Sequence, residues 1–305
     1  MTELQVRRPK FDFTDDVPWI WHPQNPAFSF LMNATSIIAI CFEQMIVAAV
    51  QEAKPRMTDP DVAAEATAFL RQEAQHSSSH RKHINALIKH YPGLQQTLDN
   101  AMACFDRLTA TTSVEFLLAY VADLEATFTP SFKLMLDNEA TLFRPGDDRV
   151  ASLFLWHFVE EVEHRSSALL IYDAVVGDSW YRIRVLPAVV KHLLEVMSVI
   201  ADGVNAHVPL ADREVDARTL LPGYGARENL KSKLRGRDRS VPRPCPPFKG
   251  VPRKQILVAA GRVLLSQKPF HNPEHEPLPQ FADQWFRRWD RGDDVTRWYA
   301  TSASG

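Results

Sequence analysis

Apolar residues recur at helical spacing along most of the chain, and no region has the apolar–polar alternation of β-strands. Proline, glycine and acidic or hydroxyl residues interrupt these segments at Pro55, Asp59-Pro60, Tyr91-Pro92-Gly93 and Arg144-Pro145-Gly146-Asp147. Such residues end one helix and cap the next. The pattern therefore predicts an all-α protein with helices over residues 27–52, 60–90, 94–108, 113–139, 148–176 and 181–206, followed by a short helix over 255–267.

The first predicted helix is unusually apolar. Residues 27–50 carry a single formal charge, Glu43, and are long enough to cross a bilayer. The central helix of a helical bundle, buried on all sides, has the same composition. We favour the buried helix and expect no stable membrane insertion, because Glu43 has chemical partners elsewhere in the sequence.

The two ends of the chain differ in character from its centre. Residues 1–26 contain several prolines and tryptophans and read as an irregular lead-in, whereas residues 207–255 are rich in Pro, Arg and Lys. The basic stretch is expected to be a linker or surface arm rather than a binding tail for nucleic acid or anionic lipid. We predict a bundle over 1–206. Residues 207–305 then form an extension whose aromatic end docks on the bundle or on a second copy in a homodimer.

Composition narrows the class of protein. Hydrophobic residues make up 45% of the 305, which is enough for a substantial core, and the formal net charge of −2 gives no general attraction to nucleic acid. The three cysteines, Cys41, Cys104 and Cys245, are far apart and form no CxxC pair. Disulfide and cysteine–zinc frameworks are therefore not expected, and a reducing cytoplasm fits. The first residues lack the apolar stretch of a signal peptide.

Two Glu-x-x-His pairs stand out, Glu73-His76 in the second predicted helix and Glu161-His164 in the fourth. Residues three apart on a helix share a face, so each pair can hold one metal site. Glu43 and Glu73 lie equally far from the predicted turn near residue 58. Glu125 and Glu161 likewise lie equally far from the predicted turn near residue 143. A buried charge is costly without a partner, so four carboxylates at matched heights in apolar helices are not expected to be isolated surface residues. They indicate a shared site instead.

This arrangement is the di-metal carboxylate pattern, with one Glu from each of two helices and Glu-x-x-His from the other two. Carboxylate and imidazole ligands suit two iron ions, with manganese or zinc as alternatives. His80 and His157 lie one turn from these pairs on the same faces, and are either ligands or supports for the ligands. Thr129, Glu160 and Glu163 are the candidates for moving protons. The predicted metal ligands are Glu43, Glu73, His76, His80, Glu125, His157, Glu161 and His164.

With these residues identified, the chain resembles a bacterial family labelled "predicted metal-dependent hydrolase", which belongs to the ferritin-like class. The likeness rests on FEQ around Glu43, FLRQEAQHSSSHRKHIN at 69–85, LEATFT at 124–129 and LWHFVEEVEHRSSALLIYD at 155–173, with a weaker echo at FHNPEH near residue 270. It implies a ferritin-like four-helix bundle with additional helices. The HxxxExxH of the fourth helix is also similar to that of di-iron arylamine N-oxygenases, in which the extra histidine, here His157, joins the metal site.

Three functions fit these residues. The leading hypothesis is a non-haem di-iron enzyme that activates dioxygen to oxidise a small, largely apolar molecule, supplied with electrons by a donor protein. The second is hydrolysis by a hydroxide that bridges two metals, as the family label suggests. The third is a non-enzymatic metal or redox protein. The fold cannot decide among them, because such bundles host all three classes.

Overall fold

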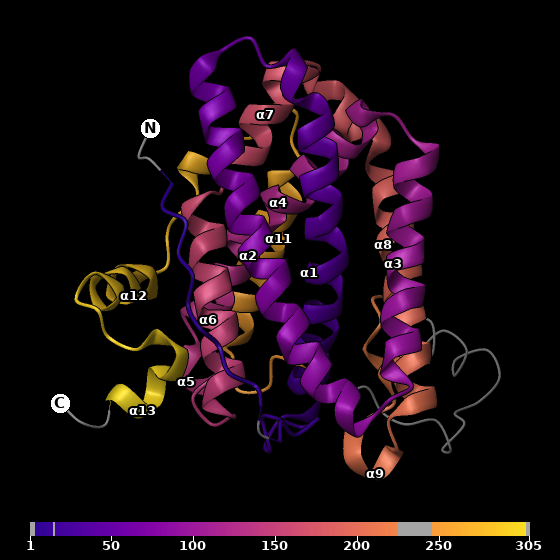
Figure 1. The fold of residues 1–305 in the computed structure, drawn as a ribbon, viewed down its shortest axis with the longest axis vertical. Helices are drawn as coiled ribbons and strands as arrows, with labels where there is room; N and C mark the ends of the chain where they lie inside the picture. Colours follow the sequence, from indigo (N-terminus) through magenta and orange to yellow (C-terminus); the bar gives the residue numbers. More distant parts are fainter. Residues whose placement is uncertain (1–3, 15, 225–245, 303–305) are drawn as a thin grey trace.

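The computed structural model describes residues 4–14, 16–224 and 246–302, and within these ranges the chain forms helices and turns with no strand (Figure 1). This confirms the predicted all-α bundle. Cys245 and most of the basic stretch before Lys249 lie outside the described residues. Cys41 and Cys104 are both buried free thiols.

A four-helix bundle forms the centre of the molecule. Its helices form a closed ring. Helix α1 contacts α2 and α4, and on the opposite side α6 and α7 each contact the same two helices. The first three bundle helices are α1 (Pro26–Ala53), α2 (Pro60–His90) and α4 (Val114–Leu136), and the fourth consists of two parts, α6 (Asp148–Glu163) and α7 (Ser167–Val175).

The helix starts follow from local capping chemistry. The side chain of Asp59 accepts from the backbone N–H of Asp61, with Pro60 as the first residue of α2. Ser113 caps α4 and Asp147 caps α6 in the same way. These boundaries agree with the sequence, because a cap is a local feature that needs no tertiary contact to be recognised.

Helix α1 lies in the core. The helical stretch Pro26–Arg56 has the length and the mean hydropathy, 1.6, of a membrane span, but 67% of its most apolar window is buried inside the protein. It packs along α2 and contacts α3, α4 and α8. Burial of most of its length accounts for the apolar sequence without a membrane.

A second pair of helices flanks the bundle. Helix α3 (Leu94–Thr111) packs along α8 (Ser179–His207), and both contact α1 (Figure 1). Two glycines permit close approach in this region, since a Cβ at Gly203 would lie 2.2 Å from Thr97 Oγ1, and one at Gly93 would lie 2.2 Å from His207 Nδ1. The pair therefore widens the molecule on the side away from α6.

The fourth bundle helix differs from its prediction as a single element over 148–176. It breaks after Glu163, and His164, Arg165 and Ser166 form a turn before α7 begins. Arg165 and Ser166 both donate to the carboxylate of Glu274, 2.6 and 2.7 Å away. These contacts with a distant segment, together with the weak helix propensity of serine, favour the turn. The break leaves His164 within hydrogen-bond distance of Glu161, as in an unbroken turn.

Both ends of the chain lie against α6. The N-terminal strand-like segment runs along α2 and α6, with Phe11 against Trp156 and Phe13 against His83. At the other end, Trp298 donates its backbone N–H to Ser152 of α6. The aromatic C-terminal segment therefore docks on the bundle of its own chain (Figure 1). The remaining elements are η1 (Lys54–Arg56), α5 (Glu139–Leu142), α9 (Leu210–Arg213), η2 (Ala217–Leu220), α11 (Arg253–Ser266), η3 (Pro273–His275), α12 (Gln280–Asp290), η4 (Val295–Arg297) and α13 (Trp298–Ser302).

Candidate metal centre

The four bundle helices bring acidic and histidine side chains together at mid-height. Helix α1 supplies Glu43 and α4 supplies Glu125, while the other ligand candidates come from α2 and from α6 with the turn that follows it. Two groups in the described chain have ligand atoms close enough to hold a metal ion. They are Glu43, His76, His157 and Glu161 in the first group, and Glu73, Glu161 and His164 in the second.

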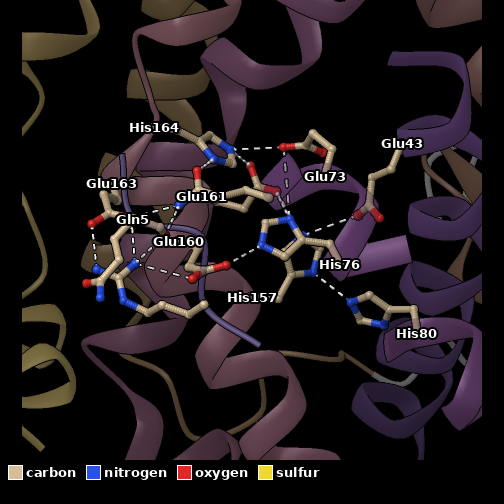
Figure 2. A network of polar contacts seen from close by, with 12 residues as sticks. Gln5, Glu43, Glu73, His76, His80, His157, Glu160, Glu161, Glu163 and His164 are labelled. Atoms are coloured by element: carbon tan, nitrogen blue, oxygen red, sulfur yellow. Dashed lines mark hydrogen bonds and ion pairs between the residues drawn. The ribbon is translucent and has the colours of Figure 1, made fainter. Parts of the chain in front are cut away.

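The first group gathers around the Oε1 atom of Glu161. His157 Nε2 lies 2.8 Å and His76 Nδ1 3.4 Å from this oxygen. Glu43 Oε1 approaches from α1, 3.4 Å from His157 Nε2. Figure 2 shows these side chains converging from different helices. Two carboxylates and two imidazoles thus face a common point.

The second group gathers around the other oxygen of Glu161. His164 Nε2 lies 2.9 Å from Glu161 Oε2 and 3.3 Å from Glu73 Oε1. Glu125 Oε2 is 3.6 Å from the same nitrogen. Glu161 therefore offers one oxygen to each group, and it would contribute a ligand atom to each of two ions if both positions were filled.

Several of these polar atoms have no hydrogen-bond partner within the described chain. Both oxygens of Glu73, Oε2 of Glu43, Oε1 of Glu125 and Nδ1 of His76 are buried and make no hydrogen bond to any residue that the structure describes. Buried polar atoms almost always have a hydrogen-bond partner. A cluster of buried carboxylate oxygens without such partners therefore indicates a site for a cation. The donor set, hard oxygens with imidazole nitrogens, matches iron, manganese or zinc.

The charges lead to the same conclusion. Burial and the neighbouring carboxylates raise the pKa values of Glu43 and Glu125 well above the ordinary range, and that of Glu73 to about 7. His164 has its pKa raised well above normal, because the contacts with Glu161 and Glu125 outweigh its burial. Without a cation, three of the four carboxylates thus resist ionisation, whereas the neighbouring His164 and His157 lower the pKa of Glu161 well below its usual range. Two divalent ions would balance the charges of all four carboxylates.

Other residues fix the orientation of the imidazoles. His164 Nδ1 donates to Gln72 Oε1 at 3.0 Å, and His76 Nε2 donates to Glu160 Oε2 at 2.9 Å. These bonds leave His164 Nε2 and His76 Nδ1 facing the metal positions. Support of this kind, from behind the ligand, sets the tautomer and raises the basicity of a ligating histidine.

His80 lies behind His157 rather than in either group. Its Nε2 is 2.7 Å from His157 Nδ1, and its Nδ1 is 2.8 Å from Ser36 Oγ. Both ring nitrogens are therefore engaged and neither faces the metal positions. If His157 Nδ1 donates to His80, then His157 Nε2 has no proton and is ready to ligate. Of the two extra histidines considered from the sequence, His157 belongs to a group that could hold a metal ion and His80 contacts His157 from behind.

Glu160 and Glu163 are both held by an arginine that the sequence did not single out. Arg7 Nη1 lies 3.2 Å from Glu160 Oε1, and the two terminal nitrogens of Arg7 bind Glu163 at 2.7 and 2.8 Å. Gln72 donates to Glu163 as well and to the backbone carbonyl of Gln5. All four carboxylate oxygens are thus occupied, and both groups lie on the side of His76 opposite Glu43 (Figure 2). This favours positioning over the acid–base role predicted for them.

Thr129 is buried on α4, one turn after Glu125. Its predicted role in handling protons stays a prediction.

Replacing His80 by alanine is expected to weaken metal binding without removing it. His157 would lose the partner that fixes its ring, and loss of such a partner typically lowers metal affinity about 10- to 100-fold. Competition with a chromophoric chelator measures the change. Exchange of the exposed His90, on the same helix, serves as the control. An unchanged affinity in the His80 variant would show that the ring of His157 is fixed by other contacts.

A family model described as "predicted metal-dependent hydrolase" matches residues 5–233, a range that contains all the candidate ligands. This confirms the resemblance inferred from the sequence motifs. Neither the curated proteins nor the solved structures yield a significant match.

Proposed function

The chain belongs to the family of predicted metal-dependent hydrolases. From that premise, we propose that it is a non-haem di-iron enzyme that uses dioxygen to oxidise a small, largely apolar organic molecule. The family and the buried groups of Glu and His side chains support a metal-dependent enzyme. Iron as the metal and oxygen as the reactant are our own assignment.

One observation carries the choice of oxygen chemistry. Around the two ligand groups, every oxygen of Glu160 and Glu163 is already bound by Arg7, Gln72 or His76. In the described chain, these were the best candidates for an acid or base separate from the ligands. A metal-dependent hydrolase commonly needs such a group to move a proton to its leaving group. An oxidase of this class relies on its metals for the electron transfer and needs less acid–base help from side chains.

The surroundings suit a reactive oxidant. Phe69 packs edge-on against His164 with ring centroids 4.9 Å apart, and Trp156 packs against His76 at the same distance. On the other side, Phe132 stacks on Phe128 and lies near His157. These rings cover the centre on the sides away from Glu43, and an apolar surrounding of this kind strengthens the interactions of charged groups.

When bound, two ferrous ions would supply the electrons and the coordination sites for dioxygen reduction. The chain itself would hold them with Glu161 between the two positions, Glu43 and Glu73 on either side, and oriented imidazoles. Repeated turnover requires a source of electrons, which we propose is a separate donor protein.

Hydrolysis is the second candidate, and the description of the family favours it. In that case the same ligands would hold zinc or manganese, and a metal would act as a Lewis acid. Both candidates share the site and differ in the metal and the co-reactant, so one experiment separates them.

The test loads metal-free protein with two equivalents of ferrous iron under anaerobic conditions and then mixes it with aerated buffer. Oxygen uptake and iron oxidation are expected to be faster than for the same iron in buffer alone. The matched sample is the zinc-loaded protein, assayed on 4-nitrophenyl esters and phosphates. Uptake no faster than with free iron, together with hydrolysis by the zinc form, would replace the oxidase assignment with the hydrolase one.

A further inference from the structure

A pocket leads from the surface to the first group of ligands. It has a volume of about 390 Å³ and lies between α1 and α2. Its lining comprises Glu43, Gln44, Val47, Ala74, Ser77, Ser78 and Arg81. Glu43 is the one member of the metal-ligand groups in this lining, and its Oε2 is buried without a hydrogen-bond partner. The pocket is therefore a route for a small molecule toward the candidate metal centre.

The sequence of α2 explains the space. Ala74, Ser77 and Ser78 are small residues on a stripe next to the ligand face that carries Glu73 and His76. Ser77 turns its hydroxyl to the carbonyl of Ile40, which leaves little side chain in the pocket. One turn further along the same stripe is Arg81, about 6 Å beyond Ser77 at 1.5 Å per residue. The pocket thus has a carboxylate at its floor and a guanidinium at one end.

Arg81 lacks the partner that comparable arginines have. Arg7, Arg149, Arg165 and Arg182 are largely buried, and each pairs with a carboxylate. Arg81 is partly buried, yet in the described chain its hydrogen bond is to Met102 Sδ at 3.6 Å, and no carboxylate lies within ion-pair distance. Thioether sulfur is a weak acceptor. The guanidinium therefore keeps donors free for a ligand.

We propose that Arg81 binds the carboxylate of the substrate, and that the apolar part of the substrate extends through this pocket toward Glu43. A guanidinium recognises a carboxylate through two parallel hydrogen bonds, which fix direction as well as position. Val47 and Ala74 provide an apolar wall between the two ends. The substrate class is thus a small carboxylic acid with an apolar tail. This proposal rests on the proposed function, since it assumes that the same centre performs the reaction.

The binding experiment uses protein loaded with zinc, which does not change oxidation state. Calorimetry compares phenylacetate and 4-phenylbutyrate with their neutral amides. The carboxylates are expected to bind more tightly than the amides. Arg81→Met is expected to weaken carboxylate binding about 10- to 100-fold, because it removes charge-assisted hydrogen bonds while keeping an apolar stem. Arg81→Lys should give an intermediate loss, since lysine keeps the charge without the planar fork.

Arg71→Met is the matched control, because Arg71 is an exposed arginine of α2 that does not line the pocket. Zinc content and melting temperature should be the same in all variants, which separates recognition from folding. Equal carboxylate affinity in Arg81→Met and the wild-type protein would overturn the proposal, as would failure of the wild-type protein to bind either carboxylate at millimolar concentration. Binding that depends on Arg81 in a protein without oxygen uptake would retain the recognition site and reject the oxidase.

Discussion

Replacing Glu161 by glutamine is expected to abolish metal binding at both positions, because its two oxygens face separate groups of ligands. The wild-type protein should hold about two transition metals per chain, as di-metal carboxylate bundles do. An amide is a poorer ligand than a carboxylate and cannot balance the charge of two cations. Metal analysis of protein expressed with added iron measures the loss directly.

Loss of the metals should also lower the thermal stability of the protein. A metal present at 100 times its dissociation constant stabilises the folded state by about 3 kcal/mol. For a chain of 305 residues, that corresponds to a melting temperature raised by roughly 4–5 °C. The shift should be absent in Glu161→Gln and intact in Glu195→Gln, whose carboxylate is exposed on α8. A variant that still takes up two metals would show that Glu161 does not bridge them.

Much of the candidate metal centre could be predicted from the sequence, because the spacing of residues along a helix determines which side chains share a face. The i, i+3 placement of Glu73 with His76 predicts a shared face, and capping residues fix where the helices begin. From those two facts, the level positions of Glu43 and Glu125 follow. The structure places these side chains together, and the family match covers them all.

Other features were beyond local reasoning. The break at His164 depends on contacts of Arg165 and Ser166 with Glu274, more than a hundred positions away. Arg7 reaches Glu160 across 153 positions. Neither contact leaves a periodic signal in the sequence, because each depends on how a terminal segment docks on the bundle.

Gln72 could have been noticed, since it stands directly before Glu73. Its amide links His164 to Glu163, with the oxygen accepting from the imidazole and the nitrogen donating to the carboxylate. An amide can do both at once, because its oxygen accepts and its nitrogen donates. The role of a residue beside a ligand pair is therefore worth weighing whenever it is Gln or Asn.

Replacing Arg7 by alanine is expected to destabilise the protein by about 3–5 kcal/mol, the usual cost of leaving a buried charge without its partner. Arg7 is 5% exposed, and the carboxylate of Glu160 is fully buried beneath it. Its guanidinium also lies over the ring of Phe286, 4.7 Å from the centroid, so the variant loosens the C-terminal segment as well. Chemical denaturation monitored by circular dichroism measures the loss.

The control is Arg8→Ala, an exposed neighbour whose exchange should change the stability by less than about 0.5 kcal/mol. The triple variant Arg7→Ala with Glu160→Gln and Glu163→Gln tests the cause. Glutamine at position 160 can still accept from His76, but it carries no charge that needs Arg7. If uncompensated charge is the cause, this variant should recover much of the lost stability. If it is no more stable than Arg7→Ala, the loss comes from packing against Trp285 and Phe286 rather than from the carboxylates.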